Sequence, residues 1–139
     1  MPYRWSARSL ERLHTCHPDL IRLFEAAIKD RRLKLDLTVL QGHRTVEEQS
    51  RNVQTGASNT MRSRHLLSPS MAVDVAPYVD GAVSWHWPHY YMVAPVIEKI
   101  AKEMRIDVEW GGHWTRLRDG PHWQLPDPIP EQEWKALGL

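Results

Sequence analysis

Apolar residues at helical spacing mark three segments of the chain. The segment 18–31 opens with a proline, a residue favoured at the first helical position, and one helical face of it is apolar: Leu20, Ile21, Phe24, Ala27 and Ile28. Leu10 and Leu13 indicate a shorter helix before it. The third helix is predicted over 88–104, where Pro95 is expected to kink the helix or delay its start.

A polar helix is predicted from a local capping signal. Thr45 is followed three residues later by Glu48, which is the arrangement of a capping box, and Gly56 is expected to end the helix. The next stretch, 57–70, has no apolar period and is rich in Ser, Asn and Arg. A loop of this length usually has a function.

Alternating apolar and polar residues predict a sheet. The clearest alternation covers 33–39 and ends at Gln41 and Gly42. Shorter strands are expected over 71–75, 106–110 and 122–125, with turns at Asp80-Gly81 and Asp119-Gly120-Pro121. With the helices, these strands predict a small α+β domain that has a short, mostly antiparallel sheet with helices packed on it.

The composition agrees with one globular domain. The chain has 139 residues, of which 42% are hydrophobic and 25% charged. A chain of this size fits one domain, so we treat 1–139 as a unit. Prolines at every second position from 126 to 130 introduce a tail that ends in a short helical run packed by Trp134.

Charge and cysteine content exclude several classes of partner. Lys and Arg number 18 and Asp and Glu 17, a formal net charge of +1, so no long-range field favours nucleic acid or a membrane surface. The sequence contains no run of 18 apolar residues that could span a membrane, and no signal peptide is recognisable. The lone Cys16 fits a reducing cytoplasm. We interpret it as a small core or surface thiol, with a nucleophile paired to His14 or His17 as the alternative.

A scattered set of residues has the chemistry of a metal site. His65 ends the polar loop, Asp74 lies on the following strand and His122 opens the last one. Two imidazoles and one carboxylate leave a fourth position for water in a catalytic zinc site. Asp119, three residues before His122, lies where a general base could act. The alternative interpretation is that these residues lie in exposed polar loops.

Other histidines and the tryptophans are weaker candidates. His86 and His89 resemble a metal pair, but Pro88 lies between them and no carboxylate is close in sequence, which favours an exposed loop or a helix start. Several tryptophans could line a sugar-binding groove; core packing is expected for most of them, with Trp114 the one expected to be exposed: Trp85, Trp87, Trp110, Trp114 and Trp123.

Six motifs follow one another between about residues 9 and 125. They are Gln41-Gly42-His43-Arg44-Thr45 with Gln49, Gly56-Ala57-Ser58, Ser63-Arg64-His65, Ala72-Val73-Asp74-Val75-Ala76-Pro77, Gly111-Gly112 with Trp114, and Asp119-Gly120-Pro121-His122. In this order they resemble the VanY-like family of zinc peptidases, and in particular the phage endolysins that act as L-alanyl-D-glutamate peptidases. The fold of that family, a small α+β domain of the Hedgehog/DD-peptidase type, agrees with the pattern of strands and helices.

The resemblance implies a role for each matching residue. His65, Asp74 and His122 would be the ligands of Zn²⁺, and Asp119 would be the catalytic acid/base. Arg44 and Ser63 would face the substrate, and Trp114 is the aromatic residue expected beside it. The catalytic core of the peptidase domain would cover about 9–125, followed by the proline-rich tail and short helix over 126–139.

The sequence departs from the family pattern at two points. Eight residues separate His65 from Asp74, two more than usual, and the usual glycine is missing. A longer loop adds little to the cost of closure, so both ligands can still reach one ion, and a distorted site is the alternative. His113 stands where Asp is common after the glycine pair, and we expect it to be a structural or supporting residue.

The resemblance therefore implies a zinc endolysin that cuts the stem peptide of bacterial peptidoglycan between L-Ala and D-Glu. A D-Ala-D-Ala carboxypeptidase or dipeptidase of the same family and a catalytically silent wall-binding module are the alternatives. As an endolysin, the protein is expected to be a monomer that stays in the host cytoplasm. A separate membrane-permeabilising protein, a holin, would release it to the periplasm and cell wall.

Overall fold

The fold is built on one antiparallel sheet. The computed structural model describes residues 2–139, and within them five strands form a sheet of order β1-β2-β5-β4, with β3 paired to the end of β2. The strands are β1 (Asp36–Gln41), β2 (Ala72–Val79), β3 (Ala82–Val83), β4 (Glu109–Trp110) and β5 (His122–Gln124). The predicted α+β class with a short antiparallel sheet is confirmed.

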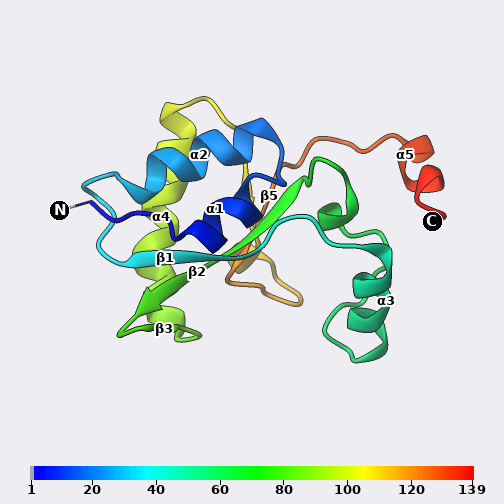
Figure 1. Ribbon diagram of the computed structural model, residues 1–139, viewed down its shortest axis with the longest axis horizontal. Coiled ribbons are helices and arrows are strands. Elements are labelled where there is room, and N and C mark those ends of the chain that lie inside the picture. The colour runs from blue at the N-terminus through cyan, green and yellow to red at the C-terminus, as the bar shows by residue number, and fades with distance from the viewer. Residues whose placement is uncertain (1) are drawn as a thin grey trace.

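Three helices cover one face of this sheet (Figure 1). They are α1 (Ala7–Leu13), α2 (Pro18–Ile28) and α4 (Trp87–Glu103). Two further helices, α3 (Val46–Gln54) and α5 (Glu131–Ala136), lie apart from them, at the end of the molecule opposite to the N-terminus. No helix within residues 2–139 is long and apolar enough to cross a membrane.

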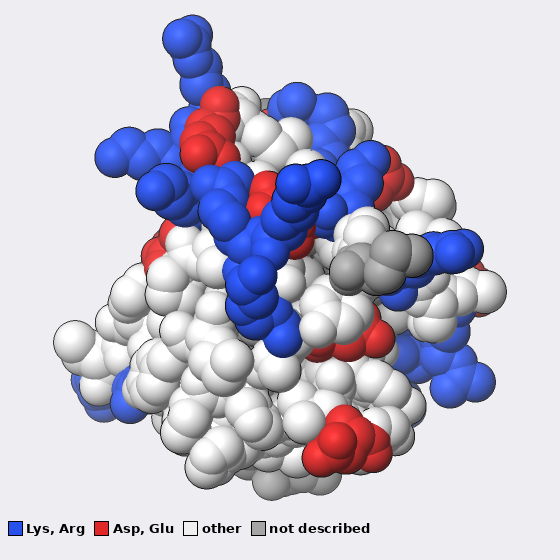
Figure 2. Space-filling view, turned by 90° about the vertical axis from the view of Figure 1, so that its left-hand side faces the viewer, with Lys and Arg blue, Asp and Glu red and all other residues white. Residues whose placement is uncertain are grey.

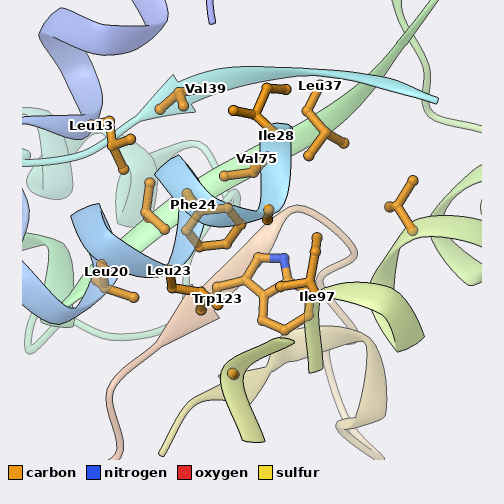
Figure 3. Close-up of a cluster of buried hydrophobic side chains, with 14 of the residues drawn as sticks. Leu13, Leu20, Leu23, Phe24, Ile28, Leu37, Val39, Val75, Ile97 and Trp123 are labelled. Carbon is orange, nitrogen blue, oxygen red and sulfur yellow. The ribbon is translucent and has the colours of Figure 1, made fainter. Parts of the chain in front are cut away.

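The hydrophobic core lies between the helices and the sheet (Figure 3). Phe24 of α2 meets Trp123 of β5 edge to face, with ring centroids 6.0 Å apart, and Trp123 in turn stacks on Trp110. Aliphatic side chains from α1, α2, α4, β1 and β2 fill the space around these rings: Leu13, Leu20, Leu23, Leu37, Val39, Val75 and Ile97. Burial of each such side chain stabilises the folded state by about 1.5–3 kcal/mol relative to leaving it exposed.

The central strand β2 separates the core from a polar face. Val73 and Val75 are buried at 0% and 3% exposure, and Asp74 between them points to the opposite face because side chains alternate along a strand. Asp74 is paired with Gln41 of β1 and with His122 of β5. The register that buries the valines therefore places these three polar residues together on the other face.

The predicted capping box is confirmed, whereas the end of α2 and the start of β1 differ from the prediction. Helix α2 ends at Ile28 because the following residues turn back, with the Leu33 amide donating to the Asp30 carbonyl. Leu33 lies in this turn and its side chain is buried, so the sequence alternates as in a strand although no strand forms there. Strand β1 begins only at Asp36.

The proline in α4 neither delays nor ends the helix. Pro95 is exposed inside a helix that already begins at Trp87. Of the strand predicted over 106–110, only Glu109–Trp110 forms, because Ile106 fills the core from the connection after α4. Strand β2 is longer than expected and passes through Pro77 to Val79.

Cys16 is a core residue. Its side chain is 2% exposed and its thiol donates to the Ala72 carbonyl. The neighbouring histidines are engaged elsewhere: His14 pairs with Glu25, and Nδ1 of His17 accepts the Asp19 amide. Burial raises the pKa of the Cys16 thiol to about 12. This agrees with the interpretation of a small core thiol, and neither His14 nor His17 is placed to act as a base for a cysteine nucleophile.

We expect Cys16 to be inert in the folded protein. Burial keeps reagents out, and the raised pKa keeps the nucleophilic thiolate scarce at neutral pH. Incubation with iodoacetamide at pH 8, followed by mass spectrometry, should show no adduct on native protein and one adduct after unfolding in guanidinium. Rapid labelling of the native protein would contradict the burial.

Charged residues are unevenly distributed although their sum is close to zero. Arg32 bridges two segments, with ion pairs to Asp30 at 2.9 Å and to Glu103 at 2.7 Å. Further exposed cations lie close in sequence to Arg32 and to Glu103: Lys29, Arg31, Lys34, Lys99, Lys102 and Arg105. Figure 2 shows Lys and Arg gathered over the upper part of one face, whereas its lower part is largely uncharged. The net charge of +1 therefore conceals a locally cationic surface.

Candidate metal centre

Three side chains from separate segments converge on the polar face of the sheet. Nε2 of His65 lies 3.3 Å from Oδ1 of Asp74, and Nδ1 of His122 lies 3.4 Å from the same oxygen. One ligand atom from each residue lies within 4.8 Å of the other two, a grouping that could hold a metal ion. The rings of His65 and His122 meet edge to face at 5.3 Å. The structure thus brings together all three residues predicted as ligands.

Hydrogen bonds fix which nitrogen of each imidazole faces the cluster. Nδ1 of His65 donates to the Gly42 carbonyl at 2.7 Å, so Nε2 is the nitrogen that faces Asp74. Nε2 of His122 donates to Oε1 of Gln124 at 2.8 Å, which leaves Nδ1 toward Asp74. Such outer partners orient the ligands of metal sites. The cluster could therefore hold a cation between its three side chains.

The long loop between His65 and Asp74 is anchored at its far end. Ser70 exchanges backbone hydrogen bonds with the connection between α1 and α2, donating to the Thr15 carbonyl and accepting from the His17 amide. His65 itself lies in the short 3-10 turn η1 (Arg64–Leu66), where Ser63 caps the turn by accepting the His65 amide. These anchors bring both ligands together despite the two additional residues.

Gly42 allows the end of β1 to approach α1 and the residues after it closely. A Cβ at this position would collide with the Thr15 side chain and with the Arg12 carbonyl. The Gly42 carbonyl is the acceptor that orients His65. A side chain here would thus displace the strand end that fixes the imidazole.

Asp119 lies at the edge of the cluster. Its Oδ2 is 4.0 Å from Nδ1 of His122, and its side chain is 46% exposed. Gly111, in the 3-10 turn η2 (Gly111–His113), packs so closely that a Cβ would contact both Asp119 and His122. Desolvation by the surrounding walls, followed by the negative charge of Asp74, raises the pKa of the Asp119 carboxyl. A carboxylate with a raised pKa is a stronger proton acceptor.

Arg44 is held in place by two glutamines. Its Nε donates to Gln41 at 2.9 Å and its Nη1 to Gln49 at 2.6 Å, while Nη2 lies 3.5 Å from Oδ2 of Asp74. Gln49 is fully buried and also donates to the Thr60 carbonyl, so it connects Arg44 to the polar loop. The guanidinium is thus a fixed positive charge at the wall of the site.

A cavity of about 730 Å³ opens above the cluster. Its floor is formed by His65, Asp74, Asp119 and His122, and the loop over 56–64 forms one wall. The predicted substrate-facing residues also line it: Arg44, Ser63 and Trp114. The Trp114 ring lies 5.0 Å from the His122 ring, and its Nε1 donates to Glu109. The candidate metal centre is therefore open to a ligand of peptide size.

The weaker candidates lie outside this cluster. Nδ1 of His89 contacts the Ser84 hydroxyl at 2.6 Å, and neither His86 nor His89 belongs to a metal-binding group within residues 2–139. His113 is exposed and pairs with Glu98 at 2.9 Å. Among the tryptophans, the expectation for Trp114 is corrected, because Trp85 is the more exposed, at 67%.

Sequence reasoning did not identify the supporting amides. Gln124 orients His122, and Gln41 holds Arg44. Neutral amides carry no charge and are weak metal ligands, so no pattern of spacing distinguishes them from surface residues. Gln41 stands in one of the quoted motifs, but its supporting role follows only from the cross-strand register, in which it pairs with Asp74.

The metal-free cluster has a defined charge pattern. Burial alone would raise the pKa of Asp74, but the charges and hydrogen bonds of His65 and His122 outweigh it and hold the pKa well below its usual range. Burial alone would lower the pKa of His122, but its bond to Asp74 outweighs burial and raises the pKa above its usual value.

We expect the metal-free protein to lose stability between pH 6 and pH 8. A histidine whose pKa is raised by folding stabilises the fold fully below its unfolded pKa, and this contribution disappears as the pH rises through the folded pKa. The melting temperature of EDTA-treated protein should be higher at pH 6 than at pH 8. His122→Gln should reduce this difference, and an unchanged difference in the variant would contradict the assignment to His122.

A family model described as phage L-alanyl-D-glutamate peptidase matches residues 1–124, a range that includes the whole cluster and Asp119. The chain belongs to this family. The resemblance predicted from the ordered motifs is thereby confirmed.

Individual members of this peptidase family and one solved structure are similar to the chain. It is 28% identical over 123 residues to the L-alanyl-D-glutamate peptidase of Escherichia phage T5, covering 86% of this chain and 87% of that protein. It is 34% identical over 91 residues to the L-alanyl-D-glutamate peptidase of a Listeria phage, covering 66% of this chain and 31% of that protein. The crystal structure of the Serratia marcescens L-Ala D-Glu endopeptidase ChiX has a TM-score of 0.78 and 42% identity, covering 88% of this chain and 90% of that one.

Proposed function

We propose that this chain is a zinc peptidase that hydrolyses the L-Ala–D-Glu bond in the stem peptide of bacterial peptidoglycan. The observation that carries the proposal is the cluster of His65, Asp74 and His122 beside Asp119 on the floor of a cavity. The phage relatives and the Serratia protein are named for this bond, and the chain belongs to the phage family.

The donor set fits zinc. Zn²⁺ takes imidazole nitrogen and carboxylate oxygen at about 2.0–2.2 Å in tetrahedral sites, and such bonds separate neighbouring ligand atoms by roughly 3.3–3.5 Å. The spacings from Oδ1 of Asp74 to the two imidazole nitrogens, 3.3 Å and 3.4 Å, have this length. Three protein ligands also leave one position for water or substrate, as catalytic zinc sites require.

The residues around the cluster divide the work of hydrolysis. Bound Zn²⁺ would supply a Lewis acid for the scissile carbonyl and would make a nearby water more acidic. Asp119 accepts the proton of the attacking water at its carboxylate and then delivers it to the amine of the departing D-Glu. Its raised pKa and its partial exposure to the cavity suit both transfers.

Arg44 and the cavity wall bind the substrate. Arg44 provides a fixed positive charge for the developing oxyanion or for a carboxylate of the stem peptide, which is an anionic peptide. Ser63 and Trp114 line the same cavity and are positioned to contact the peptide. The domain acts as a monomer in this proposal, because one chain supplies every residue named.

The substrate lies outside the cytoplasmic membrane of the host. We propose that the protein accumulates in the host cytoplasm and reaches the periplasm and cell wall through a holin. The family description as a phage peptidase supports this route.

Digestion of purified sacculi tests the proposed bond. The protein should clear the suspension and expose new amino groups on D-Glu, because this cut detaches the stem peptide from its glycan strand, and EDTA should block both results. Release of free D-Ala without clearing would instead identify a carboxypeptidase. Clearing with new reducing sugar ends would identify a glycosidase, and binding without any product would identify a silent wall-binding module.

A further inference from the structure

A second hollow adjoins the cavity on the side of Asp119. It has a volume of about 250 Å³ and is lined by Trp85, Trp87, Tyr90, Arg118 and the turn over 119–121. Trp85, Asp119 and Pro121 line both the cavity and this hollow. The two spaces are therefore neighbours, and Asp119 stands at their junction.

The aromatic and cationic wall of the hollow is held by contacts within the protein. The Arg118 guanidinium lies 4.2 Å from the centre of the Trp87 ring, and Arg118 also donates to the Gly112 carbonyl and to the Tyr91 hydroxyl. Trp87 stacks on Tyr91, with ring centroids 5.7 Å apart. A guanidinium placed over an aromatic face is itself a stabilising contact, so this wall needs no ligand to form.

Trp85 is exposed although its backbone neighbours are fixed. Its ring is 67% exposed, which is unusual for a large aromatic residue. The preceding Ser84 is held by its amide, which donates to the Pro77 carbonyl, and by its carbonyl, which accepts the Tyr90 hydroxyl. An indole that lines two hollows and is left in solvent offers a flat apolar face to a ligand.

Sugar rings have the chemistry that this wall accepts. An aromatic face packs against the C–H face of a pyranose, and a guanidinium donates to hydroxyl and acetamido oxygens. Peptidoglycan carries such a ring close to the scissile bond, since only L-Ala and a lactyl group separate that bond from the sugar. Two residue lengths span roughly 7 Å, which suits a hollow that shares Asp119 with the cavity.

We propose that Trp85, together with Trp87 and Arg118, binds the N-acetylated sugar ring to which the stem peptide is attached. This inference rests on the proposed function and adds an orientation to it. The glycan lies on the Trp85 side of Asp119, and D-Glu and the following residues lie on the side of Arg44 and Ser63. The protein thereby distinguishes a stem peptide attached to glycan from a free peptide.

Two soluble substrates test this subsite. One is a disaccharide muropeptide, and the other is the same stem peptide with an acetyl group on L-Ala in place of the sugar. Trp85→Ala should lower kcat/KM for the muropeptide by about ten-fold, mainly through KM, and should change the acetyl-peptide value by less than about two-fold. Trp85→Phe, which keeps an aromatic face, should restore most of the loss.

Tyr78→Ala is the matched control, because Tyr78 is an exposed aromatic residue on β2 that lines neither hollow. It should leave both kinetic constants unchanged. If wild type cuts both substrates and Trp85→Ala lowers both values equally or neither, the sugar subsite is wrong and the proposed function stands. If wild type cuts neither substrate, the proposed function fails and the subsite fails with it.

Discussion

Replacing His122 by alanine is expected to remove the bound metal and all measurable peptidase activity. In the proposed site His122 would supply one of three ligand atoms, and the remaining pair of His65 and Asp74 would hold the ion too weakly. Because the site forms only in the folded chain, lost binding is also lost stability, about 2.7 kcal/mol when zinc is present at 100 times its Kd. Metal analysis of the purified variant and its melting temperature with and without zinc measure both effects.

Two further variants sharpen the result. His86→Ala changes an exposed histidine outside the cluster and should keep full metal content. Gln124→Ala removes only the acceptor that orients His122 and should weaken metal affinity by about 10–100-fold. Wild-type protein that was never exposed to a chelator, carries no metal and gains no stability from added zinc would show that the ligand assignment is wrong.

Asp119→Asn should lower turnover by about 100-fold or more while the protein keeps its fold and its metal. An amide cannot accept the proton of the attacking water, and a positioned general base contributes a factor of this size. The variant should show wild-type metal content and melting behaviour, with loss confined to kcat on soluble stem peptide. Asp107→Asn, at an exposed position away from the cavity, is the control.

Retention of most activity in Asp119→Asn would place the base elsewhere. Glu109 is the next carboxylate to replace, although both of its oxygens are occupied. One accepts Nε1 of Trp114 and the other accepts the Gln124 amide. These contacts favour Asp119, whose carboxylate is partly exposed to the cavity.

The helices could be predicted because their signals are local. A proline at the start of α2 and the capping box of α3 are complete within a few residues. The start of β1 was misplaced because Leu33 is buried by a turn, and burial alone does not distinguish a turn from a strand. Helix α4 continues through Pro95 because packing of its buried face outweighs one missing hydrogen bond.

The site was predictable in a different way. The sequence has eight histidines, so residue chemistry alone allowed several possible ligand sets. The ordered motifs selected the set of His65, Asp74 and His122. Their convergence depends on the β2–β5 register and on the anchoring of Ser70, which are contacts between distant segments. The exposure of Trp85 likewise depends on tertiary packing, which is why the expectation fell on Trp114 instead.

The alternation of Val73, Asp74 and Val75 has a consequence for the kinetics of metal capture. The pairing of β2 with β5 that buries the valines also places Asp74 beside His122. A register shift of one residue would bury Asp74 and expose the valines. A folded chain therefore already holds its donors at their working separations. Uptake of the cation should need no rearrangement of the protein, and its rate should depend on the exchange of hydration water and on the release of the proton that His122 shares with Asp74.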